Sequence, residues 1–288
     1  MRVVSIDPHP SKDSVVCTDD GNGNIRFLSK TTGDLREFVK CLAKTGVLLC
    51  WDAPLTGPRS IKAAGQSAGD FSIRGIERFF RTGDEFNAYA KRETGTGNDK
   101  KSERKWKGIS VSPYAQCQHW TITRSMLGLP RVGEYDQNDI PFRLLVEPDQ
   151  DPLGQRQPRV AEVHPAVAVW LWCKNEISDF RYKDRKAGKK RRDKIRKDIW
   201  AKVARVAATH GVRFSRPPGD SDELDAGVGF LLGALYLQDR HQASDGFVVQ
   251  MIGSRNTGAW LLPAVQGLAE AWESRSKRAR EKPTRSGC

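Results

Sequence analysis

Three acidic residues lie at or near the ends of short apolar runs in this sequence. Asp7 ends the run RVVSID, Asp52 ends VLLCWD, and Glu162 lies within VAEV. A buried carboxylate without a partner is costly, so the recurrence indicates a shared use for these acids. Asp222 and Asp225 add two carboxylates that are three residues apart and therefore lie on one face of a helix.

Carboxylates held close together repel one another, so cations must neutralise them or some must stay protonated. Oxygen ligands suit hard divalent cations such as Mg²⁺ or Mn²⁺. Two such ions about 4 Å apart can activate a water and stabilise the leaving oxygen of a phosphodiester. We therefore expect a metal site whose candidate ligands are Asp7, Asp52, Glu162, Asp222 and Asp225.

His164 is the candidate for proton transfer beside this site. It lies two residues after Glu162, and residues two apart in a strand share a face. A neutral imidazole there could move protons during hydrolysis. The alternative is a histidine with a role only in a turn or in the core.

Short strands and helices must position these residues. Each apolar run is brief, rich in Val, Ile or Leu, and bounded by turn formers, which is typical of buried strands. The predicted strands are Arg2–Asp7, Ser14–Thr18, Ile25–Ser29, Val47–Asp52 and Val160–Val163. Helices are predicted over Leu35–Lys44, from Ala166 to about Lys174, and within Pro217–Arg240, where Asp220 is the expected N-cap. This order places the first and fourth strands side by side.

The segment between the fourth and fifth predicted strands differs from its surroundings. Residues 56–159 are polar and rich in glycine, which indicates a large insertion. We predict one domain over residues 1–240, interrupted by this insertion. Residues 241–288 then form a C-terminal extension with a basic tail.

The charge of the chain indicates a polyanionic partner. The 288 residues carry a formal net charge of +13, and this charge is clustered, which favours DNA or RNA over an evenly solvated basic surface. Residues 181–197 alone hold eleven Lys or Arg, although such a run can also be only a solvated stretch. Candidates for phosphate contacts or, for the tryptophan, base stacking are Lys12, Lys189, Lys190, Arg191, Arg192 and Trp106.

The cysteines and the apolar stretches exclude several other classes. The six cysteines form no C-x-x-C pair and show no zinc-like spacing. No charged leader precedes a long apolar run at the start, and no apolar stretch is long enough to span a bilayer. We therefore expect a cytoplasmic protein with reduced thiols and no membrane partner.

Several short motifs together resemble one known family. SIDPHPS, WDAPL, AEVHPAV, YKDRKAGKKRR and DELDAG occur in the order found in domain-of-unknown-function family 429, whose members are regarded as predicted RNase H-like nucleases. The resemblance covers residues 3 to about 240. It implies an α/β RNase H-like fold, a mixed five-stranded sheet with flanking helices. It also implies that Asp7, Asp52, Glu162 and Asp225 are the acidic positions.

Three functions fit these features. The first is a metal-dependent nuclease that hydrolyses phosphodiester bonds. The second is a nucleic-acid-binding protein without catalysis, whose affinity would come from the basic run alone. The third is an actin-like or sugar-kinase-like ATPase, which needs Gly-rich phosphate loops. DPHPSK contains no glycine and DAPLTG only one, which argues against ATP binding.

Overall fold

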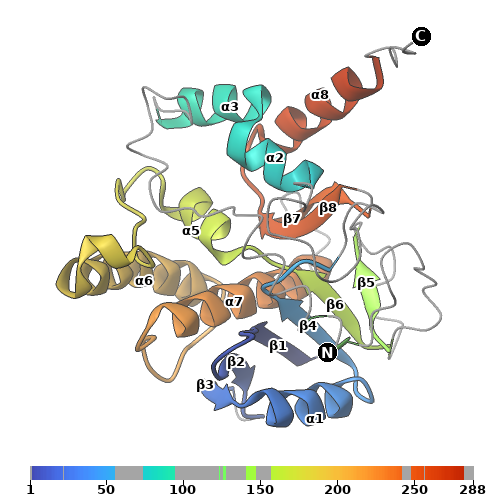
Figure 1. Cartoon of the computed structure of the whole chain (residues 1–288), viewed down its shortest axis with the longest axis vertical. Coiled ribbons are helices and arrows are strands. Elements are labelled where there is room, and N and C mark those ends of the chain that lie inside the picture. Colours follow the sequence, from blue (N-terminus) through green and yellow to red (C-terminus); the bar gives the residue numbers. More distant parts are fainter. Residues whose placement is uncertain are drawn as a thin grey trace.

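A six-stranded mixed sheet forms the centre of the computed structural model of the chain (Figure 1). The structure describes residues 2–21, 23–55, 74–94, 123, 126–127, 141–146, 157–241, 248–255 and 257–281. The strands are β1 (Arg2–Asp7), β2 (Ser14–Asp19), β3 (Ile25–Lys30), β4 (Val47–Trp51), β5 (Arg143–Leu145) and β6 (Arg159–Glu162). Their spatial order is β3-β2-β1-β4-β6-β5. β2 runs antiparallel to both of its neighbours, whereas β1, β4, β6 and β5 are mutually parallel.

The mixed α/β class predicted from the sequence is confirmed, with one correction to the sheet. All five predicted strands occur with bounds that differ by a residue or so. The sheet has a sixth strand, β5, inside the segment taken as an insertion. Its three residues, Arg143–Leu145, are too few to show the alternation on which strand prediction depends.

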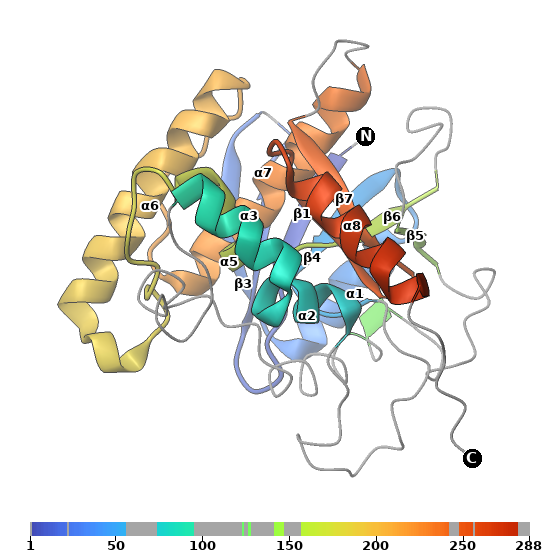
Figure 2. The same cartoon turned by 90° about the horizontal axis from the view of Figure 1, so that it is seen from above.

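Helices cover both faces of the sheet (Figure 1). On one face α1 (Thr32–Leu42) packs against the side chains of Val4 and Ile6 from β1. On the other face lie α5 (Pro165–Cys173), α6 (Lys189–Thr209) and α7 (Ser221–His241). Alternate strand residues such as Val3 and Cys50 belong to this second core, as the period of two requires. Figure 2 shows the same arrangement from above.

Glycines let α7 approach the sheet closely. A Cβ added at Gly229 would lie 2.3 Å from Ser5 Oγ on β1. A Cβ at Gly233 would lie 2.6 Å from Cys50 Sγ on β4 and 2.8 Å from Val3 Cγ1. No real Cβ tolerates such distances, so the absence of a side chain at both positions fixes how near the helix comes to β1 and β4.

The remaining elements form a layer at the other end of the molecule (Figure 1). It contains α2 (Gly75–Thr82), α3 (Asp84–Thr94), the hairpin of β7 (Val249–Ser254) and β8 (Gly258–Pro263), and α8 (Leu268–Glu281). α2 packs on β8 and α3 packs on α8, so the predicted insertion and the predicted C-terminal extension meet in this layer. α8 continues to Glu281, so the beginning of the predicted basic tail is helical.

No helix among the described ranges combines the length and the apolar character that crossing a membrane requires.

Candidate metal centre

Asp7 and Asp52 lie side by side because of the register of two parallel strands. Ile6 of β1 pairs with Trp51 of β4, so the acid that follows each of them stands at the same level. The Asp52 N–H donates to the carbonyl of Ile6 at 3.0 Å, which ties the start of the turn after β4 to β1. Period two also sends both acid side chains to the face that α7 covers.

α7 brings the third acid to this edge of the sheet. The Asp220 carboxylate accepts from the N–H groups of Asp222 and Glu223, at 3.0 and 2.9 Å, and so caps the helix as predicted. Asp225 follows in the second turn and is fully buried. One carboxylate oxygen from each of Asp7, Asp52 and Asp225 lies within 4.8 Å of the others.

The electrostatics of this group favour a cation. Burial, together with the neighbouring carboxylates, raises the pKa of Asp7 well above its usual value and that of Asp52 to about 8. Burial also raises the pKa of Asp225. The positive charge of Lys183 acts in the opposite direction on all three pKa values. Lys183 alone therefore does not offset the burial and mutual repulsion of the three carboxylates, which need a further cation or must stay partly protonated.

Tyr182 and Lys183 complete the site, and the sequence analysis did not single them out. The Tyr182 hydroxyl donates to Asp225 Oδ1 at 2.7 Å, and the Lys183 ammonium forms an ion pair with Asp225 Oδ2. Both residues lie in the motif YKDRKAGKKRR, of which only the later basic residues were predicted as functional, for phosphate contacts. Nothing in local spacing indicates that this segment meets α7, because the contact spans 43 residues.

Glu162 was predicted as a metal ligand, and its contacts argue against that role. Glu162 pairs with Trp51 across the parallel strands, one residue before Asp52, so its side chain leaves the opposite face of the sheet. Arg74 donates to both of its oxygens, at 2.8 and 2.5 Å. The Leu55 N–H and Trp260 Nε1 donate to them as well, at 2.8 and 2.6 Å. Glu162 therefore joins the turn after β4 to the layer that contains β8.

Asp222 and Lys12 were predicted to bind a metal and a phosphate, respectively. The structure pairs them with each other, and the Asp222 side chain remains 21% exposed. Asp222 lies outside the group of three acids, although its charge still raises the pKa of Asp7. Both residues therefore lie at the entrance of the site and not at its centre.

His164 is the N-cap of α5. Its Nδ1 accepts from the Val167 N–H at 3.4 Å, and its ring lies against Trp260 with centroids 4.5 Å apart. Burial, with a smaller contribution from the charges of Lys183 and Arg74, lowers the pKa of His164 to about 3. The ring is therefore neutral near pH 7, with its proton on Nε2 because Nδ1 is an acceptor. Its proposed part in proton transfer stays a prediction.

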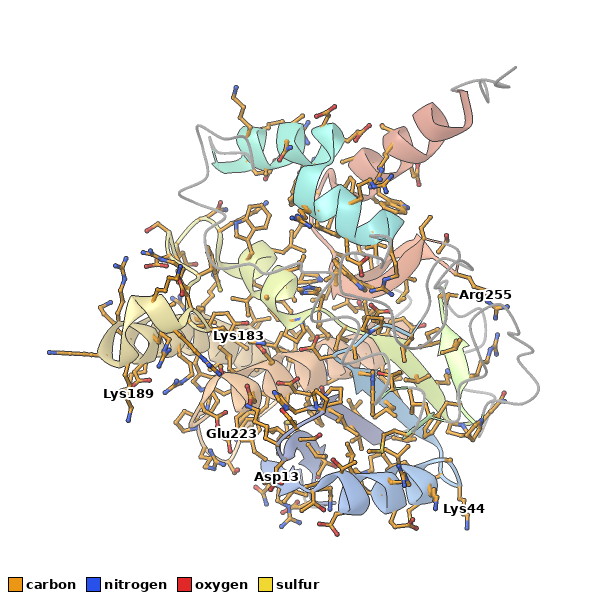
Figure 3. All side chains as sticks on the ribbon, in the orientation of Figure 1. Asp13, Lys44, Lys183, Lys189, Glu223 and Arg255 are labelled. Carbon is orange, nitrogen blue, oxygen red and sulfur yellow. The ribbon has the colours of Figure 1, made fainter. Side chains whose placement is uncertain are left out.

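The predicted basic cluster is the first turn of α6. Lys189, Lys190, Arg191 and Arg192 follow Gly188, and no acid lies in that turn. Arg191 donates to Asp179 at 2.7 Å, whereas no acidic residue in the described part of the chain pairs with the other three cations. Figure 3 places Lys183 and Lys189 on the same side of the molecule. Trp106, the predicted stacking residue, lies outside the described residues.

Comparison with known proteins finds one similarity. Residues 143–244 match the family model described as "Protein of unknown function (DUF429)". The match includes Glu162, the basic cluster and Asp225, but it begins after the strands that position Asp7 and Asp52. Neither the curated proteins nor the solved structures that were searched contain a match.

Proposed function

We propose, from its acidic site and from the resemblance to family 429 whose model residues 143–244 match, that the chain is a metal-dependent nuclease. The observation that carries the proposal is the grouping of Asp7, Asp52 and Asp225, whose carboxylate oxygens approach within 4.8 Å. Two of these acids come from neighbouring parallel strands and the third from the helix packed over them. Phosphodiester hydrolysis through carboxylate-bound metal ions needs such a convergence.

The order of the elements supports an RNase H-like fold for the core. Three strands in an antiparallel meander precede α1 and the parallel strand β4, and β6 follows on the far side of β4. The acids occupy β1, the end of β4 and the last helix of that core, as the resemblance to family 429 implies. In this reading β5 and α2–α3 belong to the insertion between β4 and β6.

The donor set fits Mg²⁺ or Mn²⁺. All three side chains offer oxygen, and the raised pKa values of Asp7 and Asp52 indicate that their ionised forms lack the compensating positive charge that a cation would supply. Asp7, Asp52 and Asp225 would hold the ion. When bound, it would supply an activated water and charge stabilisation at the phosphate. Tyr182 holds Oδ1 of Asp225 through its hydrogen bond, which leaves Oδ2 as the oxygen that pairs with a cation, Lys183 in this structure.

The first turn of α6 supports a nucleic-acid substrate. Four cations stand at a helix N-terminus, where the helix dipole disfavours positive charge. A polyanion bound there would relieve this repulsion. Lys189, Lys190 and Arg192 are the cations left for phosphates, because Arg191 already pairs with Asp179.

Cleavage assays test the proposal directly. Labelled single-stranded and double-stranded DNA, RNA and an RNA–DNA hybrid are incubated with Mg²⁺, Mn²⁺ or EDTA. We expect cleavage that requires metal and is lost in Asp7→Asn and Asp52→Asn. Asp13→Asn is the matched control, because this exposed acid lies in the turn after β1, outside the group of three acids, where its carboxylate accepts a hydrogen bond from Ser29.

Two results would contradict a nuclease. Nucleic-acid binding that survives EDTA and both substitutions, without cleavage of any substrate, would indicate a protein that binds without catalysis. A rise in melting temperature with ATP, in the absence of nuclease activity, would favour the ATPase.

A further inference from the structure

Lys183 supplies positive charge to the metal centre in the metal-free protein. Its charge acts on Asp7, Asp52 and Asp225 alike. Its direct partner is Oδ2 of Asp225, an atom that is fully buried and accepts no other hydrogen bond within the described structure. Without this ion pair, a carboxylate oxygen would be left buried and unpaired, which is strongly destabilising.

The backbone at Tyr182 is held in place, whereas the Lys183 ammonium is free to move. Tyr182 is 2% exposed and is hydrogen-bonded to Asp225, so residue 182 is anchored against α7. The neighbouring Lys183 side chain is 44% exposed. The ammonium can therefore move from Asp225 to solvent by rotations about its own side-chain bonds, without any movement of the fold.

The charge count favours such a movement when a divalent ion arrives. Three carboxylates converge here, and Lys183 offers them a single positive charge. A divalent cation attracts the same oxygens more strongly, and an ammonium left beside it would be repelled. An ion held by Asp225 must therefore either share Oδ2 with Lys183 or displace it.

We propose that Lys183 is an exchangeable internal cation, which occupies Asp225 Oδ2 in the metal-free protein and gives up this oxygen when Mg²⁺ or Mn²⁺ binds. The inference rests on the metal centre of the proposed function. Lys183 then has two effects on the site. The residue stabilises the empty site, and it weakens metal affinity, because each metal ion must break the ion pair. The released ammonium then lies at the mouth of the site, where a substrate phosphate would meet it.

Metal binding in Lys183→Met tests this exchange. Mn²⁺ is titrated into wild type, Lys183→Met and Lys186→Met, and free Mn²⁺ is followed by electron paramagnetic resonance. Lys186 is the matched control, since it is an exposed lysine of the same loop without an ion pair to any described acid. We expect Lys183→Met to bind Mn²⁺ about tenfold more tightly. In EDTA it should melt at a lower temperature than wild type, and Mn²⁺ should remove that difference.

A second measurement uses the wild-type protein alone. The lysines are acetylated for short times with and without Mn²⁺, and the rate at each site is read by mass spectrometry. Lys183 should react several-fold faster with Mn²⁺ while Lys186 is unchanged. Mn²⁺ binding that is equal or weaker in Lys183→Met, or an unchanged Lys183 rate, overturns the exchange and leaves the nuclease proposal intact. No Mn²⁺ binding to any of the three proteins overturns both.

Discussion

Gly229→Ala tests how the packing of α7 on β1 positions the acids. A Cβ at this position would lie 2.3 Å from Ser5 Oγ and 3.3 Å from Val163 Cγ2. Ser5 is buried, so its hydroxyl has little room to move away. Gly229 lies one turn after Asp225 on the same face of α7, and Ser5 lies two residues before Asp7. A helix displaced at Gly229 therefore separates Asp225 from Asp7.

Two opposing contributions determine how much Gly229→Ala changes the free energy of unfolding. Forcing an extra methyl into a packed core costs about 1–3 kcal/mol. Alanine in place of glycine in a helix gains about 1 kcal/mol. We expect Gly229→Ala to lower the free energy of unfolding by about 1 kcal/mol and to weaken Mn²⁺ binding.

Ser5→Ala is the second variant needed to test whether Ser5 is the group that a methyl at position 229 contacts. The buried Ser5 Oγ has no hydrogen-bond partner in the described part of the structure. Removing an unsatisfied hydroxyl should therefore stabilise the protein, by up to about 1 kcal/mol. It also removes the atom closest to the new methyl, so Gly229→Ala should become neutral or stabilising in this background.

Urea denaturation of the four proteins in EDTA gives the double-mutant cycle. We expect a coupling energy of about 1–2 kcal/mol between the two positions. Mn²⁺ affinity, which we expect to be weaker in Gly229→Ala, should return to the Ser5→Ala value in the double variant. If Gly229→Ala destabilises both backgrounds by the same amount, within about 0.3 kcal/mol, then Ser5 does not set the approach of α7.

Three further predictions follow from the site. Burial raises the pKa of Asp52 to about 8, against 3.8 for a free carboxyl, so the unfolded chain loses this proton first and stability falls as the pH rises from about 4 toward 8. In EDTA, the melting temperature of wild type minus that of Asp52→Asn should decrease as the pH rises over that interval. A difference that does not change with pH would contradict the raised pKa. Glu162→Gln should destabilise the fold by about 3 kcal/mol or more in urea denaturation, because it breaks the buried pair with Arg74; loss of Mn²⁺ binding at unchanged stability would instead restore Glu162 as a ligand. Replacing Lys189, Lys190 and Arg192 together by Gln should make the slope of log affinity against log salt concentration less steep by about 0.7–0.9 per cation. Fluorescence anisotropy with labelled nucleic acid measures this slope, and an unchanged slope would show that the substrate binds elsewhere.

The strands and their acids were predictable from the sequence because the signals are local. Apolar runs bounded by turn formers located β1, β2, β3, β4 and β6 within a residue or so. The cap at Asp220 located the start of α7. Chain order then indicated that Asp7 and Asp52 follow neighbouring strands, and the register agrees. Each of these inferences depends on residues only a few positions apart.

Tertiary structure alone decided which acids meet. Glu162 and Asp52 both lie at ends of neighbouring strands, but a register offset of one residue sends their side chains to opposite faces. No local pattern reveals that offset. Arg74, Trp260 and Leu55 converge on Glu162 from distant parts of the chain, and Lys183 reaches Asp225 in the same way. The sequence thus determined which residues could bind a metal, and the pairing of strands with α7 determined which three of them lie together.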